Sequence, residues 1–343
     1  MPEANNPGGL AVVTGASGHV GVNLVRELLK RGRRVRVLVH HGGRSLDGLD
    51  IERVDGDVLD SAALDRVFQG ADTVFHLAAV ISISGDKNGL VQRVNVIGAG
   101  NAASAARRAG VKRYVHCSSI HAFDLHREQH SVNENTPRAD KATSFDYDRS
   151  KWRGECAVRK EIELGLDAVI VNPTGVVGPY DFAPSRMGRV LLDLYNRKLP
   201  SLVDGGFDWV DVRDVVLALL AAETHGRTGE NYILGGGYRA VPELAAIAAS
   251  VTGVRPPRLV SPRWLARVGV PFALGYARVM GGEALFTYES LDTLGESRNI
   301  DFGKASRELG HAPRTLEETI RDSYRWFVEA GMMPAGALKG PRA

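Results

Sequence analysis

The sequence predicts an α/β fold with a doubly wound parallel sheet and a smaller, mainly helical C-terminal lobe. In the first half of the chain, short apolar segments alternate with segments of helical periodicity. This alternation indicates a parallel sheet covered by helices on both faces, and right-handed crossovers make it doubly wound. After about residue 173 the rhythm breaks, and a chain of 343 residues has room for a second lobe.

The elements of the sheet domain are predicted from hydrophobic periodicity. Residues 10–14 form a buried strand, and Val20, Leu24 and Leu28 then recur on one face of a helix that Gly32 ends. Further strands are expected at residues 35–39, 73–77, 114–118 and 167–171, and further helices at 94–109 and 147–164.

The second half contains Gly- and Pro-rich loops, short strands and several helices. A strand at 209–212 leads into a helix at 214–223, and another strand follows at 232–234. From residue 241 the pattern is mainly helical, with a final amphipathic helix at 315–330. We expect the sheet domain at 8–173 plus 208–234, the lobe at 174–207 plus 235–331, and a flexible tail at 332–343.

Composition excludes several classes of function. The formal net charge is only +3, and no basic tract with interleaved aromatic residues is present, which disfavours nucleic-acid binding. The two cysteines, Cys117 and Cys156, have no metal-like spacing and fit a reducing compartment. No apolar run approaches the roughly 20 residues of a membrane span. We expect a cytoplasmic protein without a metal site or an integral membrane segment.

The stretch at 264–280 is helical and apolar, but Arg267, Pro271 and Arg278 interrupt it. The interpretation favoured by composition is lobe core or the wall of a substrate cavity. Contact with a membrane surface is the alternative.

A glycine-rich loop follows the first strand directly. Gly15, Gly18 and Gly21 recur at every third position between that strand and the next helix. Glycine lets a phosphate approach the main chain, and the helix N-terminus supplies free N–H groups and a positive dipole end. The strand, loop and helix context therefore predicts a dinucleotide site.

Tyr147 and Lys151 are four positions apart on the predicted helix at 147–164, so their side chains lie on one face, a turn apart. An ammonium group beside a phenol favours the phenolate. We therefore expect Lys151 to lower the pKa of Tyr147 toward the range in which tyrosine transfers protons.

These motifs together resemble one enzyme family. The loop at 14–21, Asp57, the segment at 76–79, Asn95 and the Tyr147/Lys151 pair occur in the order typical of the extended short-chain dehydrogenase/reductases. These belong to the NAD-dependent epimerase/dehydratase superfamily. The resemblance covers about residues 10–330. It implies a Rossmann domain with a C-terminal substrate lobe, a nicotinamide cofactor and a small-molecule substrate, with a homodimer by analogy.

The resemblance assigns residues to the cofactor. The glycine loop would carry the pyrophosphate, Asp57 would bind the adenine amino group with Val58 beside the ring, and Ser118 would lie against the nicotinamide. The full set that it implies for cofactor binding is Gly15, Ser17, Gly18, His19, Val20, His40, Arg44, Asp57, Val58, Leu77, Ala78, Ala79, Ser118, Tyr147, Lys151, Pro173 and Val176.

The end of the second strand bears on the choice between NAD and NADP. An acidic residue there binds the ribose 2′-OH, whereas a basic one accommodates a 2′-phosphate. This chain has no acid at 39–44 and places Arg44 and His40 there, although reductase-like members often carry arginine where His40 stands. We expect NADP(H), with NAD(H) as the alternative and a solvated loop position as the other interpretation of Arg44.

For catalysis the resemblance implies Ser119, Tyr147, Lys151 and Asn95. In this arrangement Tyr147 transfers the proton, Ser119 polarises the reacting oxygen, Lys151 also holds the nicotinamide ribose, and Asn95 supports the site from a neighbouring helix. The residues expected to face the substrate are His121, Phe123, Tyr180, Arg186 and Trp209, with Arg213 as a further candidate, although packing explains several of them equally well.

Three functions compete at this stage. The segment at 173–185 is similar to dihydroflavonol reductases, cinnamoyl-CoA reductases and 3β-hydroxysteroid dehydrogenases, which favours a carbonyl reductase or alcohol dehydrogenase for a bulky, fairly apolar molecule. The alternative is a nucleotide-sugar epimerase or dehydratase with tightly bound NAD, in which Arg186, Arg189 or Arg213 binds phosphate. The third is a catalytically inactive dinucleotide sensor, which the retained Ser119, Tyr147 and Lys151 disfavour.

Overall fold

A computed structural model describes residues 9–40, 43–82, 85–125, 131–280, 287–295 and 299–338, without the side chains of 87 and 272–280. Within these residues, seven parallel strands form one sheet in the order β3-β2-β1-β4-β5-β6-β10. The strands are β1 (Ala11–Thr14), β2 (Val35–Val39), β3 (Glu52–Asp55), β4 (Thr73–His76), β5 (Arg113–Cys117), β6 (Ala168–Pro173) and β10 (Asn231–Leu234). The order reverses between β1 and β4, where ligands bind in open α/β sheets.

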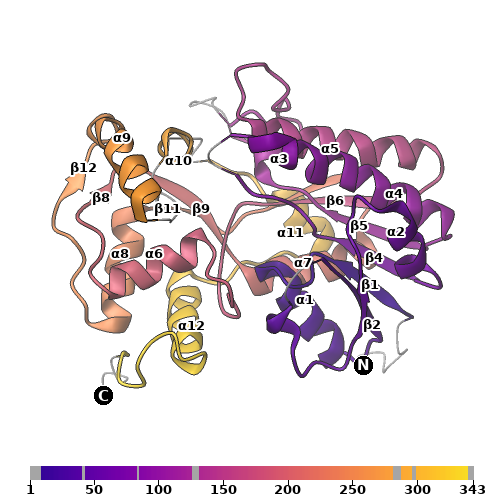
Figure 1. Cartoon of the computed structure of the whole chain (residues 1–343), viewed down its shortest axis with the longest axis horizontal. Coiled ribbons are helices and arrows are strands. Elements are labelled where there is room, and N and C mark those ends of the chain that lie inside the picture. The colour runs from indigo at the N-terminus through magenta and orange to yellow at the C-terminus, as the bar shows by residue number, and fades with distance from the viewer. Residues whose placement is uncertain are drawn as a thin grey trace.

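Helices cover both faces of this sheet (Figure 1). On one face lie α1 (His19–Lys30), α7 (Val212–His225) and α11 (Gly303–Leu309). On the other lie α2 (Ser61–Phe68), α4 (Ala99–Arg108) and α5 (Asp146–Glu163). Short helical segments connect these elements: η1 (Arg44–Leu46), η2 (Lys87–Gly89), α3 (Leu90–Gln92), η3 (Arg93–Gly98) and η4 (Ile120–Ala122). Apart from the edge strand β3, the strands are largely buried, as a doubly wound sheet requires.

The lobe lies beside one end of the sheet domain (Figure 1). In its described part it contains the mixed sheet β7 (Gly175–Val177), β9 (Gly206–Asp211) and β11 (Tyr238–Ala240), and the pair β8 (Leu202–Val203) and β12 (Val260–Ser261). Its helices are α6 (Arg186–Tyr195), α8 (Val241–Thr252), α9 (Arg263–Met280), α10 (Tyr288–Thr293) and α12 (Leu316–Glu329). Among the described residues, no helix has both the length and the apolar character needed to cross a bilayer.

The expected fold class is confirmed, but the sequence pattern missed several elements. The strand β3 and the helix α2 were not predicted, because β3 is an exposed edge strand without an apolar pattern and α2 has only 8 residues. The strand expected at 209–212 begins earlier, and it pairs with β7 and β11 instead of joining the large sheet. Conversely, α11 packs on α7 and β10 of the sheet domain, although its residues were expected in the lobe.

The segment after α12 is packed against the lobe rather than frayed. Met333 and Ala337 are buried in the cluster that includes Leu244 of α8 and Phe327 of α12. The expectation of a flexible tail from residue 332 is therefore wrong as far as residue 338, because two apolar side chains return to the core. Residues 339–343 lie outside the described part of the chain.

This packing makes a stability prediction. Replacing Met333 by alanine leaves a cavity beside Phe327, so the free energy of unfolding should fall by about 2 to 4 kcal/mol. Urea denaturation followed by circular dichroism measures the change. The control Arg321→Ala, on the exposed side of α12, should change the unfolding free energy by no more than about 0.5 kcal/mol. Equal effects of the two substitutions would show that the segment does not pack.

Candidate active site

The glycine loop between β1 and α1 is shaped for close approach of an anion. Gly15 has φ +69°, and a Cβ there would lie 2.6 Å from the main-chain nitrogen of Ala78. A Cβ on Gly21 would lie 2.2 Å from the carbonyl oxygen of Gly15. Gly18 caps α1 without a side chain, so the N–H groups of the first turn remain open toward a phosphate. The loop therefore fits the pyrophosphate of a dinucleotide.

The neighbouring residues of the loop have different roles. Ser17 is exposed at its tip, and Val20 packs on the sheet core. The His19 imidazole lies 3.0 Å from the carbonyl oxygen of Pro179, and Asn23 donates to the same carbonyl. The His19 side chain thus joins the loop to the segment that enters the lobe.

The expected adenosine residues gather beyond β2 and β3. Asp57 accepts a hydrogen bond from the main-chain nitrogen of Leu59, and its second carboxylate oxygen lies 3.1 Å from His40 Nε2. Val58 is buried against Gly98. Arg44 is exposed in η1. The structure therefore brings His40 and Asp57 together and leaves the guanidinium of Arg44 at the surface.

The chain after β4 forms the other wall of the cofactor groove. The strand ends at His76, one residue earlier than expected, and Leu77, Ala78 and Ala79 continue as a partly buried loop. The Thr14 hydroxyl lies 2.8 Å from His76 Nδ1. Pro173 is buried at the end of β6, and Val176 is partly buried in β7. The carboxyl ends of β1, β4 and β6 lie at one edge of the sheet, where a dinucleotide lies in this fold.

The residues expected to act in catalysis lie where β5 ends beside α5. Ser118 and Ser119 follow β5 directly and are both buried, and the Ser119 hydroxyl lies close enough to the Tyr147 phenol to lower the pKa of that phenol. In the described structure the Ser118 hydroxyl is buried without a hydrogen-bond partner, which suits a position against a ligand. Lys151 lies one turn below Tyr147, with its ammonium 6.0 Å from the centre of that ring. The serine, tyrosine and lysine predicted from the sequence thus form one cluster.

The expectation that Lys151 lowers the pKa of Tyr147 is wrong for this arrangement. Burial raises the pKa of Tyr147, and the hydrogen bond from Ser119 and the charge of Arg186 offset this only partly. The Lys151 ammonium points instead toward the Cys117 carbonyl oxygen, 3.5 Å away. Burial also lowers the pKa of Lys151 itself, against the opposing charge of Glu155. Tyr147 is therefore held as a neutral phenol, the form that donates a proton.

Asn95 supports the site without facing a ligand. It lies in η3, a π-helical turn, which is a distortion often found at functional sites. Its amide oxygen accepts from the main-chain nitrogen of Val80, and its amide nitrogen donates to the carbonyl of Val80 and to the Ser150 hydroxyl. Asn95 thus fixes the loop after β4 to the helix that carries Tyr147.

Two of the expected substrate residues lie beside Tyr147. The His121 ring packs edge-on against the Tyr147 ring at 5.6 Å, and His121 Nδ1 lies 3.2 Å from a carboxylate oxygen of the buried Asp148. Arg186 begins α6, close enough for its charge to lower the pKa of Tyr147. The sheet domain and the lobe each place a basic side chain near the reacting phenol.

The other expected substrate residues are used in packing. Phe123 is buried beneath the guanidinium of Arg138. The Trp209 ring is only 3% exposed, and its indole nitrogen donates to the Arg239 carbonyl. Tyr180 stacks near Phe182 and Trp326, and Arg213 pairs with Asp211 and Asp322. The structure does not bring these four side chains to Tyr147.

A buried polar network beneath the site was not predicted. The Asn172 amide nitrogen donates to the Ser119 carbonyl oxygen at 2.9 Å and to a Glu155 carboxylate oxygen at 2.7 Å. Asn231 donates to the other Glu155 oxygen and to the Asn172 amide oxygen. Glu155 is fully buried and follows Lys151 by one helical turn, so the face that carries Tyr147 and Lys151 continues to it. The spacing of four positions between Lys151 and Glu155 was the feature of the sequence that could have indicated this network.

The neighbouring strands β4 and β5 carry two buried histidines. His76 and His116 are paired in register, and their rings stack 5.4 Å apart. Burial lowers the pKa of His76 to about 3, with a smaller contribution from the charge of Lys151. Both rings therefore stay neutral beneath the site at ordinary pH.

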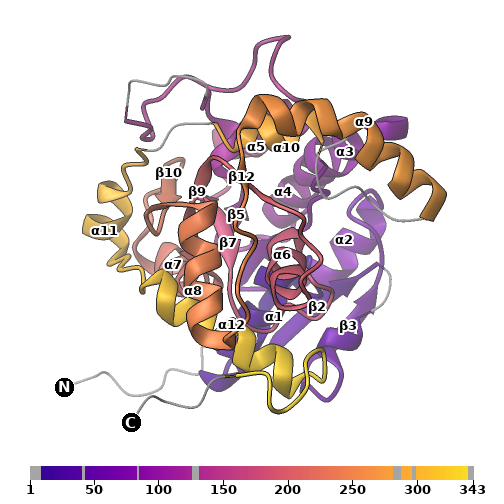
Figure 2. The same cartoon turned by 90° about the vertical axis from the view of Figure 1, so that its left-hand side faces the viewer.

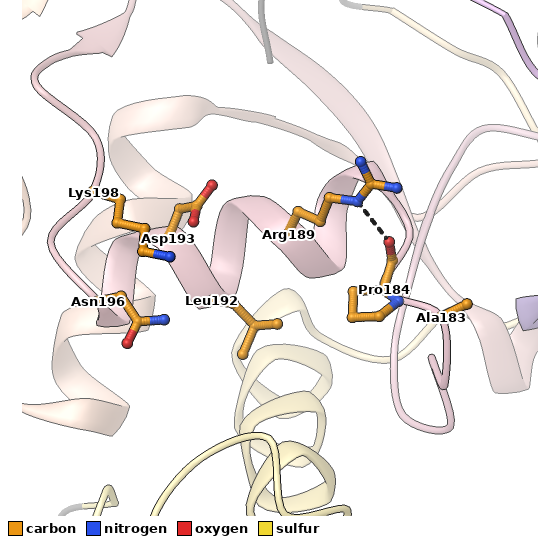
Figure 3. A pocket seen from close by; sticks show the side chains of 7 residues that line it. All are labelled: Ala183, Pro184, Arg189, Leu192, Asp193, Asn196 and Lys198. Atoms are coloured by element: carbon orange, nitrogen blue, oxygen red, sulfur yellow. Dashed lines mark hydrogen bonds between the residues drawn. The ribbon is translucent and has the colours of Figure 1, made fainter. Parts of the chain in front are cut away.

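A shallow surface depression of about 400 Å³ lies along α6 and is lined in part by Pro184, Arg189, Asp193 and Lys198 (Figure 3). The Arg189 guanidinium donates to the Pro184 carbonyl across its edge. None of its lining residues belongs to the serine, tyrosine and lysine cluster. The depression is thus separate from the candidate active site.

Comparison with known proteins agrees with this geometry. Residues 11–235 match the model of the NAD dependent epimerase/dehydratase family. Sterol demethylase protein B of Methylococcus capsulatus is 36% identical over 94% of this chain and 99% of its own. The 4-hydroxy-2-methyl-3-oxo-4-farnesyl-3,4-dihydroquinoline-1-oxide ketoreductase of Stigmatella aurantiaca is 29% identical over 95% of this chain and 98% of its own. The crystal structure of gox2253 has a TM-score of 0.82 at 33% identity and covers 94% of this chain and 99% of that one.

The buried histidines predict an acid-sensitive fold. Because the pKa of His76 is about 3 in the folded chain and ordinarily 6.5, the unfolded state binds an extra proton between these values. Stability should therefore be lost as the pH falls below about 6.5. Between pH 7.5 and 5.5, a His76→Asn variant should lose about 1 kcal/mol less unfolding free energy than the unmodified chain.

Urea titrations at several pH values measure this difference. The control His225→Asn replaces an exposed histidine at the end of α7 and should leave the slope of stability against pH unchanged. A slope unaltered by His76→Asn would contradict the assignment of a neutral buried ring.

Proposed function

Because the chain belongs to the NAD dependent epimerase/dehydratase family, we propose that it reduces a ketone, or in reverse oxidises a secondary alcohol, of a bulky and fairly apolar molecule. The observation that carries the proposal is the cluster of the buried Ser119 hydroxyl, the Tyr147 phenol and the Lys151 ammonium, which lies 6.0 Å from the centre of the Tyr147 ring. This cluster lies at the carboxyl end of β5. The glycine loop follows the carboxyl end of β1, at the same edge of the sheet.

The proposed chemistry divides between cofactor and protein. A bound NAD(P)H supplies the hydride. Tyr147, which burial keeps protonated, donates its phenolic proton to the oxygen that becomes the alcohol. Ser119 donates a hydrogen bond to the same oxygen and stabilises the negative charge that develops there. Tyr147 therefore supplies one proton, and Ser119 stabilises the charge that develops on the reacting oxygen.

Lys151 and the groups around it position the cluster. Its ammonium is buried among the Cys117 carbonyl, the Tyr147 ring and the Glu155 carboxylate. In the proposed complex it holds the nicotinamide ribose hydroxyls, and its charge stabilises the phenolate that Tyr147 becomes after proton transfer. Asn95 and Asn172 hold the two sides of this cluster in place.

Of the two nicotinamide cofactors, NADP(H) and NAD(H), we propose NADP(H). The segment from Val39 to Arg44 contains no carboxylate that would repel a 2′-phosphate. His40 already lies against Asp57, and Arg44 is exposed in the segment that follows β2. A guanidinium at this place binds a phosphate through several N–H groups at once.

The substrate class is proposed from the relatives and from the site. One relative is named for a sterol and another for a ketone that bears a farnesyl group, and each aligns over almost its whole length. His121 and Arg186 supply polar contacts near the reacting oxygen. A large alicyclic or polyprenyl ketone with one polar end is therefore the proposed substrate.

Arg186 also supports a second candidate function. A guanidinium near Tyr147 suits the diphosphate of a nucleotide sugar, and an epimerase or dehydratase would retain NAD tightly. Mass spectrometry of the purified protein separates the two candidates. Tightly retained NAD without NADPH consumption on any ketone would favour the epimerase, whereas reversible NADPH binding with ketone turnover supports the reductase.

Tyr147 is the proposed proton donor. A Tyr147→Phe variant should lower kcat for ketone reduction by at least about a hundredfold, because the general acid is lost. Its NADPH affinity, measured by fluorescence titration, should change little. The control Tyr195→Phe, in α6, should retain turnover. Near-normal turnover of Tyr147→Phe would overturn the assignment of Tyr147.

Arg44 is the residue proposed to bind the 2′-phosphate of NADP(H). Reversing the charge in Arg44→Glu should lower kcat/KM for NADPH about tenfold or more while that for NADH is unchanged or higher, since a charge-assisted hydrogen bond is lost. Arg66→Glu makes the same charge change on the exposed side of α2 and should leave the ratio of the two values intact. An equal loss with both cofactors in Arg44→Glu would contradict the NADP(H) proposal.

A further inference from the structure

A group of exposed apolar side chains lies on the lobe, just before and on β12 and on the first half of α9. It consists of Leu259, Val260, Trp264, Leu265 and Val268, here called the α9 patch. The Trp264 side chain is 67% exposed and Val268 is 61% exposed. The other large exposed apolar side chains of the described chain are scattered over several elements. Five large apolar side chains exposed within ten residues of the chain are typical of an interaction surface.

The patch is not the face by which α9 folds onto the lobe. Val270 is fully buried with Leu291 and Leu294, and Ala266, one turn earlier, packs on the same cluster. Trp264 and Val268 are likewise one turn apart, and both are exposed. Because residues four apart share a helix face, α9 presents one apolar stripe to the lobe and a second one outward.

The chemistry of the surrounding residues identifies the partner. Between residues 244 and 282 the sequence has no aspartate or glutamate and has five arginines: Arg255, Arg258, Arg263, Arg267 and Arg278. The formal charge of this segment exceeds the net charge of +3 of the whole chain. Arg255, Arg258 and Arg263 are exposed beside the apolar side chains. Tryptophan, leucine and valine flanked by arginine are typical of helices that lie in the plane of an anionic bilayer surface.

We propose that the α9 patch docks the protein on an anionic lipid surface, with Trp264 and Val268 inserted among the headgroups. The arginines are complementary to phosphate groups of the lipids. A second copy of the chain is a poorer occupant, because a symmetric contact would place the arginines of one copy against those of the other.

The position of the patch connects it to the active site. Arg267 of α9 lies over the Tyr288 ring and pairs with Asp292, both on α10. Glu289 lies on the same short helix, and the charges of Asp148 and Arg186, which also act on Tyr147, affect the pKa of its carboxyl group. Figure 2 shows α9 along one edge of the molecule with α10 beside it. Docking would hold the site close to the lipid phase, a consequence that rests on the proposed function, whereas lipid binding itself does not.

Flotation of the full chain with vesicles tests the proposal without any assay of turnover. The chain should float with phosphatidylcholine vesicles that contain phosphatidylglycerol, much less with phosphatidylcholine alone, and less at high salt. Replacing Trp264 and Val268 together by serine, or Arg258 and Arg263 together by glutamine, should lower partitioning by roughly tenfold or more. The matched control Leu164→Ser removes a side chain that is 62% exposed at the end of α5 and should float normally.

The variants are first checked for folding by circular dichroism and for NADPH binding, so that loss of flotation is not loss of structure. Absence of flotation with either vesicle, or flotation that the Trp264 and Val268 substitutions leave unchanged, would overturn the proposal. So would a patch-dependent dimer in light scattering without vesicle binding, because the occupant would then be a second copy. If the chain floats with vesicles but reduces no ketone, the result supports lipid docking by the α9 patch and contradicts only the proposed reaction.

Discussion

The site depends on the buried amide of Asn172. This one side chain contacts three elements: it lies at the end of β6, holds the Ser119 carbonyl that follows β5, and bonds to Glu155 of α5. A buried carboxylate is costly unless every oxygen has partners, and Asn172 and Asn231 provide them for Glu155. The distance between the serine loop and the helix that carries Tyr147 and Lys151 is thereby fixed. The buried polar groups below the cluster thus hold its two sides in place.

The lobe is positioned by the segment that leaves β6. His19 and Asn23 of α1 both contact the Pro179 carbonyl, and Arg26 lies 4.8 Å over the Tyr180 ring. Tyr180 has a positive φ of 60°, which costs energy for a non-glycine residue and persists only where the surroundings fix it. The glycine loop and the entrance to the lobe are thus tied together. In the proposed complex, α1 would therefore position both the cofactor phosphates and the entrance to the lobe.

The parts of the site that were predictable are those encoded over short distances. The glycine spacing and the Tyr147/Lys151 pair each lie within two helical turns, so sequence alone reveals their geometry. Whether an aromatic side chain faces a cavity or the core depends on distant segments, which is why Trp209 and Phe123 were expected at the substrate and are packed instead. Asn172 and Asn231 are 59 positions apart, and no local pattern relates them. The sign of the Tyr147 pKa shift was missed because burial, not the nearby lysine, dominates it.

The central claim is that Ser119, Tyr147 and Lys151 manage proton transfer while a hydride passes between NADPH and a ketone. Its most direct test is isotope transfer. The purified chain is incubated with NADPH deuterated at C4 and a panel of sterol and polyprenyl ketones, and the alcohols are analysed by mass spectrometry. The account predicts one deuterium at the carbinol carbon of a product. Consumption of no ketone and transfer of no deuterium, with NAD retained through purification, would contradict it.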